Sequence, residues 1–267
     1  MSFYLDRPLN FAHRGASHEA PANTLAAFLL AADLGADGIE FDVHLSKDGH
    51  VVVIHDFDLA ATTNGQGLVR TKTLAELKDL DAGRWFDPVF AGQRIPTLQE
   101  VIDAVGHRLL LNIELKTAGW SDRGLAAKVV QIVEHNGLAD RVILSSFNPL
   151  TVWRARWRNP TIATGLLYAE EMPLFLRKAW FRRLVRPTAL HPHCAMVDAH
   201  YVWWANKQGY RVNIWTADDP GDMWRFMRQG VDIIITNRPD LLREVMQAGR
   251  AAVGEPQQRL SGALYPG

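Results

Sequence analysis

The chain of 267 residues has a single cysteine, Cys194, so no disulfide framework can stabilise its fold. It has no excess of charge of either sign, since 29 Lys and Arg residues balance 29 Asp and Glu residues. Proteins that bind nucleic-acid phosphates usually have an excess of Lys and Arg, and the balanced charge therefore argues against a nucleic-acid partner. No stretch of about 18 consecutive apolar residues occurs, so we expect no transmembrane helix.

The N-terminal segment lacks the unbroken apolar stretch of a secretory signal peptide. Asp6 and Arg7 interrupt the sequence MSFYLDRPLNFAHRG where such a stretch would lie. A lone cysteine is also typical of proteins from a reducing compartment. We therefore expect a cytoplasmic protein.

The chain is instead rich in short apolar runs that alternate with helical patterns. The runs contain many Val, Ile and Leu residues and are bounded by Gly, Pro, Asn or Asp, which is typical of buried strands. The stretches between them show helical spacing of apolar residues, and several end at a glycine. This alternation predicts a parallel sheet or barrel. The nine runs span residues 9–13, 38–43, 51–56, 109–115, 142–147, 163–168, 188–192, 211–216 and 232–236.

Nine runs are one more than the eight parallel strands of an α/β barrel. The runs 38–43 and 51–56 are joined by only HLSKDGH, whereas a parallel crossover needs about a dozen residues. Lys-Asp-Gly is a turn signal, so the run 51–56 is predicted to return antiparallel to 38–43. A barrel of this kind uses about 250 residues as one domain. We therefore predict an α/β fold, a TIM (β/α)8 barrel with an extra hairpin strand.

Two regions depart from the barrel repeat. Residues 57–95 contain a TTNG turn, a short helical pattern and apolar residues of their own, and are predicted to form a small insertion subdomain. The barrel domain is predicted to span residues 1–249. Residues 250–267 lack periodicity and are predicted to form a mobile tail.

Ionisable residues gather at the carboxyl ends of the predicted strands, where α/β barrels carry their catalytic groups. Glu40 and Asp42 are two residues apart on one strand, so their side chains point to the same face. Glu114 adds a third carboxylate from the adjacent parallel strand. Converging carboxylates repel one another unless a cation neutralises them, and an all-oxygen site favours Mg²⁺ or Ca²⁺, with Mn²⁺ a further candidate. A salt-bridged network with Arg14 and Lys116 is the alternative that needs no metal.

Two histidines are expected beside these carboxylates. His13 ends the first predicted strand and His55 follows the returning strand. Imidazole titrates near neutral pH, so the two histidines are candidates for a general acid and base. The guanidinium group of Arg14 can donate forked N–H hydrogen bonds to a phosphate, and Gly15 lets the backbone approach a ligand closely.

Three segments in this order, HRGASHEAPANTLAAF, EFDVHLSKDGHVVVIHD and NIELK, resemble the glycerophosphodiester phosphodiesterase family. The resemblance continues through TTNG, LDAG, IPTLQEV, SSF, HP, NIWT and IITNRPD, and covers residues 9–240. It implies the soluble, bacterial cytoplasmic type of enzyme, with a small-molecule substrate. That enzyme would hydrolyse glycerophosphodiesters such as glycerophosphocholine and glycerophosphoethanolamine to an alcohol and sn-glycerol 3-phosphate.

The resemblance also implies a role for each candidate residue. The three carboxylates would bind the divalent cation, and His13 and His55 would be the general acid and base. Arg14 would bind the phosphate, and Lys116 would lie beside the phosphate and the glycerol. Trp215, in NIWT, would form an apolar wall for the glycerol; a core aromatic side chain at a strand end is the alternative.

One motif departs from the family pattern. The family usually has Pro-Glu-Asn-Thr where this chain has Pro21-Ala22-Asn23-Thr24. The function of the missing carboxylate is then absent or is taken over by Glu19. Asn23 or Thr24 is predicted to cap the helix that follows.

Two further segments have more than one interpretation. His191-Pro192-His193-Cys194 resembles a metal-ligand cluster, but the sequence offers no second cluster to complete a zinc site, and His191 is predicted to line the barrel mouth. Residues 174–187 mix basic and aromatic side chains, which suits a membrane surface or a lipid-like substrate. The simpler interpretation is a barrel helix with solvated basic residues and aromatic residues packed inward.

Three other functions remain open. A lysophospholipase D acting on lysophospholipids is favoured only by residues 174–187. A non-catalytic barrel that binds glycerophosphodiesters would be expected to lack one of the histidines or carboxylates, and none is missing. A Mg²⁺-dependent lyase or enolase-type barrel shares acidic strand ends, but it would not require Arg14 beside His13 or a second histidine on a hairpin.

Overall fold

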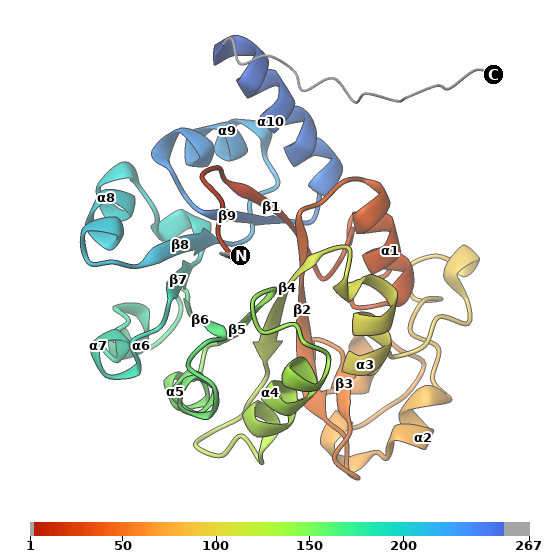
Figure 1. Cartoon of the computed structure of the whole chain (residues 1–267). Helices are drawn as coiled ribbons and strands as arrows, with labels where there is room; N and C mark the ends of the chain where they lie inside the picture. The colour runs from red at the N-terminus through yellow and green to blue at the C-terminus, as the bar shows by residue number, and fades with distance from the viewer. Residues whose placement is uncertain (1–2, 254–267) are drawn as a thin grey trace, which may run out of the picture.

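The computed structural model describes residues 3–253 and has the predicted barrel (Figure 1). Eight parallel strands follow the order β1-β9-β8-β7-β6-β5-β4-β2, and pairing of β1 with β2 closes the barrel. The ninth strand, β3, pairs antiparallel with β2 outside the closed ring. The strands are β1 (Leu9–His13), β2 (Gly38–Leu45), β3 (Val51–Val53), β4 (Leu110–Leu115), β5 (Val142–Ser146), β6 (Ala163–Tyr168), β7 (Ala189–Pro192), β8 (Arg211–Ile214) and β9 (Ile233–Thr236).

Helices surround the barrel and carry the chain from one strand to the next (Figure 1). Several begin at a side-chain cap: Thr24 accepts a hydrogen bond from an N–H of the first turn of α1, and Asn148 does so at α5. The helices are α1 (Leu25–Asp33), α2 (Leu74–Lys78), α3 (Leu98–Val101), α4 (Leu125–His135), α5 (Pro149–Arg158), α6 (Leu174–Arg177), α7 (Arg182–Val185), α8 (Ala199–Lys207), α9 (Pro220–Gln229) and α10 (Pro239–Val253).

The alternation of side chains along β2 separates the core from the site. Ile39, Phe41 and Val43 belong to the apolar layer between the strands and the helices. Glu40 and Asp42 therefore face the inside of the barrel, as their spacing predicts. The hairpin to β3 is also confirmed.

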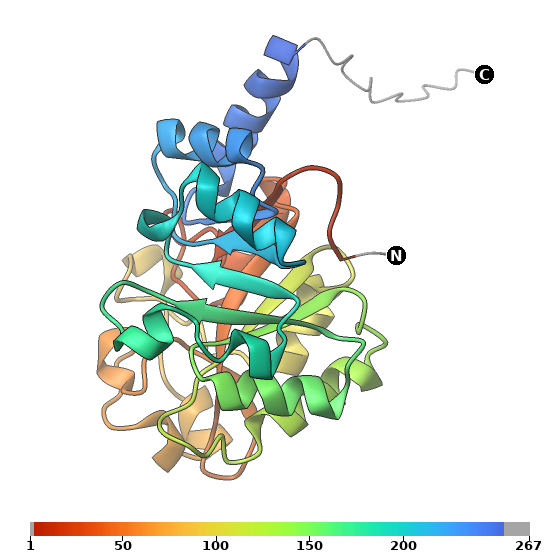
Figure 2. The ribbon, with the colours of Figure 1, turned by 90° about the vertical axis from the view of Figure 1, so that its left-hand side faces the viewer.

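The two ends of the barrel differ. Figure 2 shows the strand arrowheads pointing to the left, toward the insertion, whereas the N-terminal segment approaches from the right. Phe3 and Tyr4 pack with Leu9 and Phe11 in an apolar cluster, and the hydroxyl of Tyr4 accepts a hydrogen bond from Asn213. The carboxyl ends of the strands therefore form the mouth, and the opposite end is filled by these side chains.

Residues 57–95 fold as the predicted insertion beside β3. Leu59, Val69 and Leu77 form an apolar cluster of their own with Val52 and Ile54. The insertion is thereby fixed to the strand that precedes His55.

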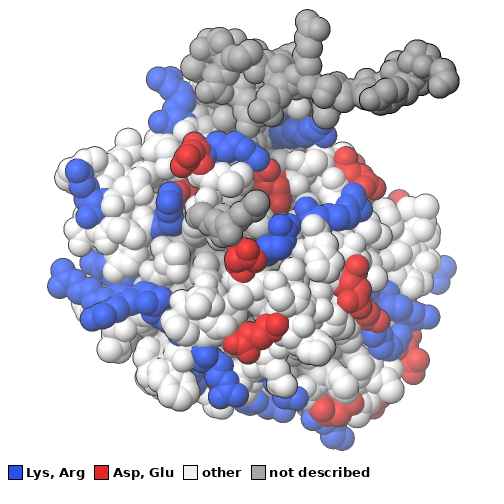
Figure 3. Space-filling view, viewed as in Figure 1, with Lys and Arg blue, Asp and Glu red and all other residues white. Residues whose placement is uncertain are grey.

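The described part of the chain ends within α10. This helix continues to Val253, four residues beyond the predicted barrel boundary, and the rest of the predicted tail, 254–267, lies outside the described residues. Within residues 3–253, no helix combines the length and the apolar character needed to cross a membrane. Basic and acidic side chains are interspersed over the face opposite the mouth (Figure 3).

Candidate active site

Strand register brings the predicted site residues together at the mouth. In the pairing of β2 with β4, Asp42 lies beside Glu114, and in the pairing of β1 with β2, His13 lies beside Glu40. Lys116 directly follows β4. Three strands that are adjacent in the barrel therefore supply five of the candidate groups.

The three carboxylates form a compact buried triad. One oxygen from each of Glu40, Asp42 and Glu114 lies within 4.8 Å of the others. Burial and the negative charge of Asp42 raise the pKa of Glu114 to about 7, and burial with both neighbouring charges raises the pKa of Glu40 well above its usual value. The triad thus has the hard oxygen donors and the mutual repulsion that a divalent cation would relieve.

Two cations lie against the triad. Lys116 Nζ is 3.0 Å from Glu114 Oε1 and 3.5 Å from Asp42 Oδ1, and Arg14 Nε is 3.5 Å from Asp42 Oδ2. Burial alone would raise the pKa of Asp42, but the charges of Lys116 and Arg14 outweigh it and lower the pKa to about 2. Asp42 is therefore the carboxylate that stays ionised, whereas Arg14 and Lys116 balance the negative charges of Glu40 and Glu114 only in part.

Arg14 has an unusual backbone and an unsatisfied side-chain donor. Its φ of 56° lies in the left-handed region, which non-glycine residues seldom adopt. Its buried Nε has no hydrogen-bond partner within the described chain. Buried donors are rarely left unpaired in proteins, and a phosphate oxygen would satisfy this one.

Asn23 is a site residue that the sequence interpretation did not assign. Its Nδ2 donates to Asp42 Oδ2 at 3.0 Å, and its Oδ1 accepts from the backbone N–H of Asp42 at 3.3 Å. Asn23 therefore orients Asp42, while Thr24 caps α1. Glu19 is exposed and does not belong to the triad. Its charge, after that of Asp240, instead helps to raise the pKa of Arg238.

His13 is held in one tautomer by a chain of hydrogen bonds. Asn237 Nδ2 donates to Asp218 at 2.6 Å, so Asn237 Oδ1 faces His13 Nδ1 at 2.7 Å and must accept from it. This arrangement leaves His13 Nε2 without the proton, 3.9 Å from Glu40. Burial and the charge of Arg14 lower the pKa of His13 to about 4, so its Nε2 can accept a proton at neutral pH.

His55 is oriented in a similar way by other partners. Its Nδ1 lies 3.0 Å from Asp56 Oδ1, which fixes the proton on Nδ1 and leaves Nε2 free. The backbone carbonyl of His55 accepts a hydrogen bond from His44 Nε2 at 3.1 Å, and the ring of His44 packs edge-to-face on Phe57. Burial lowers the pKa of His55.

A cavity of about 130 Å³ contains the reactive groups. Both histidines, Arg14, Glu40 and Glu114 line it together with Asn112, Phe147, Leu167, Trp215 and Ile235. The Trp215 indole N–H donates to the backbone carbonyl of His191, and its ring packs edge-to-face on Phe147 with the ring centres 5.5 Å apart. Trp215 and Phe147 therefore form an aromatic surface at one side of the cavity.

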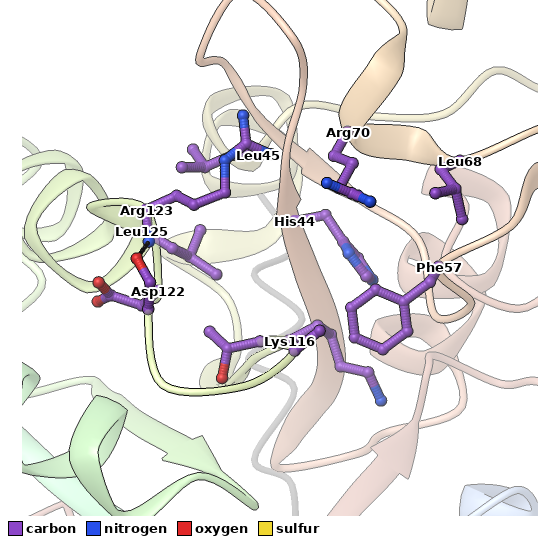
Figure 4. Close-up of a pocket in the computed structure, with 12 residues that line it drawn as sticks. His44, Leu45, Phe57, Leu68, Arg70, Lys116, Asp122, Arg123 and Leu125 are labelled. Carbon is purple, nitrogen blue, oxygen red and sulfur yellow. Dashed lines mark hydrogen bonds between the residues drawn. The ribbon is translucent and has the colours of Figure 1, made fainter.

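A second pocket, of about 260 Å³, lies on the other side of Lys116 (Figure 4). Arg70, from the insertion, and Arg123, from the loop after β4, both line it, together with Phe57. Figure 4 shows the ammonium group of Lys116 bent away from the two guanidinium groups, beneath Phe57. Neither Arg70 nor Arg123 forms an ion pair with another described residue.

Two sequence predictions about neighbouring segments are wrong. His191 does not line the mouth: it is completely buried, with Nε2 2.8 Å from Asn213 Nδ2 inside the barrel. The aromatic residues of 174–187 do not pack inward, because the segment forms two helices of four residues, α6 and α7, and the buried positions are taken by Ala179 and Val185.

Comparison with known proteins places the chain in a well-defined group. The model of the glycerophosphoryl diester phosphodiesterase family matches residues 13–241. A glycerophosphodiester phosphodiesterase of Caldanaerobacter subterraneus subsp. tengcongensis is 41% identical over 245 residues, which cover 91% of this chain and 99% of that protein.

Solved structures agree with this similarity. A phosphodiesterase of Oleispira antarctica, in complex with its product sn-glycerol-3-phosphate, has a TM-score of 0.85 and 32% identity, and the match covers 92% of this chain and all of that one (100%). A glycerophosphodiester phosphodiesterase of Agrobacterium tumefaciens has a TM-score of 0.77 and 31% identity, over 89% of this chain and 99% of the other.

Proposed function

Because the chain belongs to the glycerophosphoryl diester phosphodiesterase family, we propose that it hydrolyses glycerophosphodiesters to an alcohol and sn-glycerol 3-phosphate. Glycerophosphocholine and glycerophosphoethanolamine are the substrates with which we would begin. The observation that carries the proposal is the meeting of a buried carboxylate triad, two oriented histidines and Arg14 around one cavity. An enolase-type barrel would not need this combination.

We propose that Glu40, Asp42 and Glu114 hold one divalent cation, Mg²⁺ or Ca²⁺, with Mn²⁺ as a further candidate. When bound, the cation supplies positive charge that stabilises the phosphoryl oxygens. Arg14 contributes a second positive charge for these oxygens, since its buried Nε lies beside Asp42 but makes no hydrogen bond within the described chain. Lys116 stays beside the triad, where Glu114 and Asp42 raise its pKa despite its burial, so it remains charged next to the phosphate.

The histidines divide the proton transfers between them. Each has Nδ1 fixed by a neighbouring oxygen, so each presents Nε2 for transfer. One of them, unprotonated at Nε2, takes the proton from the attacking nucleophile. The other has to enter the reaction as the imidazolium, with a proton on Nε2 as well as on Nδ1, and donates its Nε2 proton to the departing alkoxide. Trp215 covers the apolar face of the glycerol at the side of the cavity where it meets Phe147.

The activity test is incubation of the purified protein with glycerophosphocholine and Mg²⁺, with separate detection of choline and of sn-glycerol 3-phosphate by a stereospecific dehydrogenase. We expect the two products to appear in equal amounts. Binding of glycerophosphocholine without release of either product would instead support the non-catalytic barrel, and release of phosphocholine would mean cleavage of the wrong ester bond.

The pocket beside Lys116 predicts a preference among head groups. We propose that the departing alcohol lies there, since the pocket adjoins His44 and therefore the segment that carries His55. The unpaired guanidinium groups of Arg70 and Arg123 would favour polyol or anionic alcohols over choline, because like charges repel.

We expect the double variant Arg70→Ala/Arg123→Ala to raise KM for glycerophosphoinositol by about tenfold, the equivalent of about 1.4 kcal/mol, while KM for glycerophosphocholine changes little. Steady-state kinetics on the two substrates measures this difference. Arg84→Ala, which removes an exposed arginine of the same insertion outside the pocket, is the matched control. Equal changes for both substrates would exclude the head-group assignment.

A further inference from the structure

Asp218 lies behind His13, outside the residues that line the cavity. It follows β8 in the segment NIWTADD, and its side chain reaches the end of β9. Its Oδ1 accepts from Thr236 Oγ1 and from the backbone N–H of Asn237, both at 2.8 Å, and its Oδ2 accepts from Asn237 Nδ2 at 2.6 Å. Both oxygens of Asp218 are therefore engaged as acceptors.

The carboxylate of Asp218 sets the direction of the hydrogen bonds between itself and His13. A carboxylate has only acceptor oxygens, so the amide of Asn237 turns its NH2 group toward Asp218 and its carbonyl oxygen toward His13. Two donors meet that carbonyl oxygen, His13 Nδ1 at 2.7 Å and the hydroxyl of Ser17 at 2.8 Å. A reversed amide would place two oxygens against each other at Asp218 and leave the NH2 group there unmade as a donor.

The residues between Asp218 and the His13 proton cannot determine this direction by themselves. An asparagine amide presents either its oxygen or its NH2 group to a histidine, and the hydroxyl of Ser17 can donate to the one or accept from the other. Neutral imidazole likewise has two tautomers. Among these four side chains, the carboxylate alone has a fixed role, so the position of the proton on His13 is decided at Asp218.

We propose that Asp218 is a positioning residue that selects the tautomer of His13 through the amide of Asn237. It keeps the ring proton on Nδ1 and leaves Nε2 with the lone pair that accepts a proton during hydrolysis. The inference deepens the proposed function, since His13 is one of the two histidines that transfer protons there. The position of the ring proton can nevertheless be measured without any turnover.

Asp218→Asn is expected to reverse the chain of hydrogen bonds. The introduced amide keeps an oxygen for Thr236 Oγ1 and for the backbone N–H of Asn237, so its NH2 group faces the side chain of Asn237. The amide of Asn237 then turns over, its NH2 group donates to His13 Nδ1 and to the hydroxyl of Ser17, and the ring proton moves to Nε2.

Histidine ¹⁵N NMR at pH 7.5 with saturating Mg²⁺ measures this change, because protonated and unprotonated ring nitrogens resonate far apart. Burial and the charge of Arg14 lower the pKa of His13 to about 4, so its ring is neutral under these conditions. The signals that are missing from a His13→Gln sample identify those of His13.

The exchanged pair Asp218→Asn/Asn237→Asp is expected to restore the original tautomer. The carboxylate at position 237 would accept from His13 Nδ1 and from the hydroxyl of Ser17, and the amide at position 218 would donate to that carboxylate. We expect kcat for glycerophosphocholine to fall at least about tenfold in Asp218→Asn, with KM within about twofold of the parent, and to recover most of this loss in the exchanged pair.

Asp219→Asn is the matched control for the single variant. It makes the same change of charge at the neighbouring exposed residue, and it retains the oxygen that accepts from the backbone N–H groups of Gly221 and Asp222 at the start of α9. It should leave both the tautomer and kcat as in the parent. Asp218 is itself exposed, so its replacement by an amide of the same shape should not unfold the protein.

The outcomes separate positioning from a structural role and from the proposed function. A ring proton that stays on Nδ1 in Asp218→Asn would overturn the proposal, and a fall in kcat without that change would mean that Asp218 merely supports the loop after β8. An exchanged pair whose ring proton remains on Nε2 would overturn it as well. If the proton moved as expected but the parent did not hydrolyse glycerophosphocholine, the tautomer selection would stand and the proposed function would be wrong.

Discussion

His13→Ala and His55→Ala are each expected to lower kcat for glycerophosphocholine by at least ~10², the usual contribution of one acid–base catalyst. The reason is that the two histidines line the same cavity from different elements, and neither can take over the position of the other. His13 is fixed to Asn237 at the end of β9, whereas His55 is fixed to its neighbour Asp56.

The measurement is steady-state kcat at saturating substrate and cation, with KM determined separately. His200→Ala, which removes an exposed histidine on α8 away from the cavity, is the control. Both active-site variants should keep the thermal stabilisation that Mg²⁺ or Ca²⁺ gives the parent protein, because neither histidine belongs to the carboxylate triad. Near-normal kcat in either variant would refute its assignment as acid or base.

Strand counting and side-chain alternation were sufficient to predict the barrel. The seven-residue link between 38–43 and 51–56 allowed only a hairpin, and the structure has β3 antiparallel to β2. The spacing of Glu40 and Asp42 fixed the face on which they lie, and the adjacency of β2 and β4 brought Glu114 beside them. These features depend on local geometry, which a sequence pattern records well.

The partners that orient the site could not be predicted in the same way. Asn237 is 224 residues away from His13 in the chain, and only the pairing of β1 with β9 brings them together. Asn23 lies in a segment for which the pattern suggested only a helix cap, yet its φ of 61° turns it toward Asp42. Such contacts arise from the closure of the barrel and from loop conformation, which hydrophobic periodicity does not encode.

The two errors have a similar physical origin. His191 lies near a strand end, and this position suggested that it lines the mouth. The indole N–H of Trp215 instead donates to the backbone carbonyl of His191, and the imidazole ring of His191 is hydrogen-bonded to Asn213 inside the barrel. The apolar and basic composition of 174–187 suggested one amphipathic barrel helix, but each of the two helices there has only four residues. Helices this short offer too few inward positions for three aromatic rings, and these rings remain exposed beside the cavity.

Glu40→Gln is expected to abolish cation-dependent activity and yet to stabilise the metal-free protein. A raised pKa means that the ionised Glu40 side chain is less stable in the folded chain than in the unfolded chain. At pH values above the usual pKa of a glutamate, the ionisable Glu40 side chain therefore lowers the stability of the folded protein. This loss of stability increases as the pH rises toward the pKa of Glu40 in the folded chain. The amide keeps the shape and an oxygen for the Arg14 backbone N–H, which lies 3.3 Å from Glu40 Oε2, but it removes the repulsion from Asp42 and Glu114.

Thermal unfolding at pH 7.5, in EDTA and then with added Mg²⁺, Ca²⁺ or Mn²⁺, measures both effects. In EDTA we expect the melting temperature of Glu40→Gln to exceed that of the parent by a few degrees, at about 2–4 °C per kcal/mol for a domain of this size class. Added cation should stabilise the parent, by about 2.7 kcal/mol at a hundred times the dissociation constant, and should stabilise the variant far less.

Activity completes the argument, because stability and catalysis should change in opposite directions. EDTA should remove the turnover of the parent and added cation should restore it, whereas Glu40→Gln should lose at least ~10² in kcat/KM at the same cation concentration. Glu19→Gln makes the same change in charge at an exposed glutamate and is expected to behave as the parent does. A parent enzyme fully active in EDTA, or a variant that is destabilised in EDTA yet keeps the full stabilisation by the cation, would show that the triad is a salt-bridged network with Arg14 and Lys116 and holds no metal.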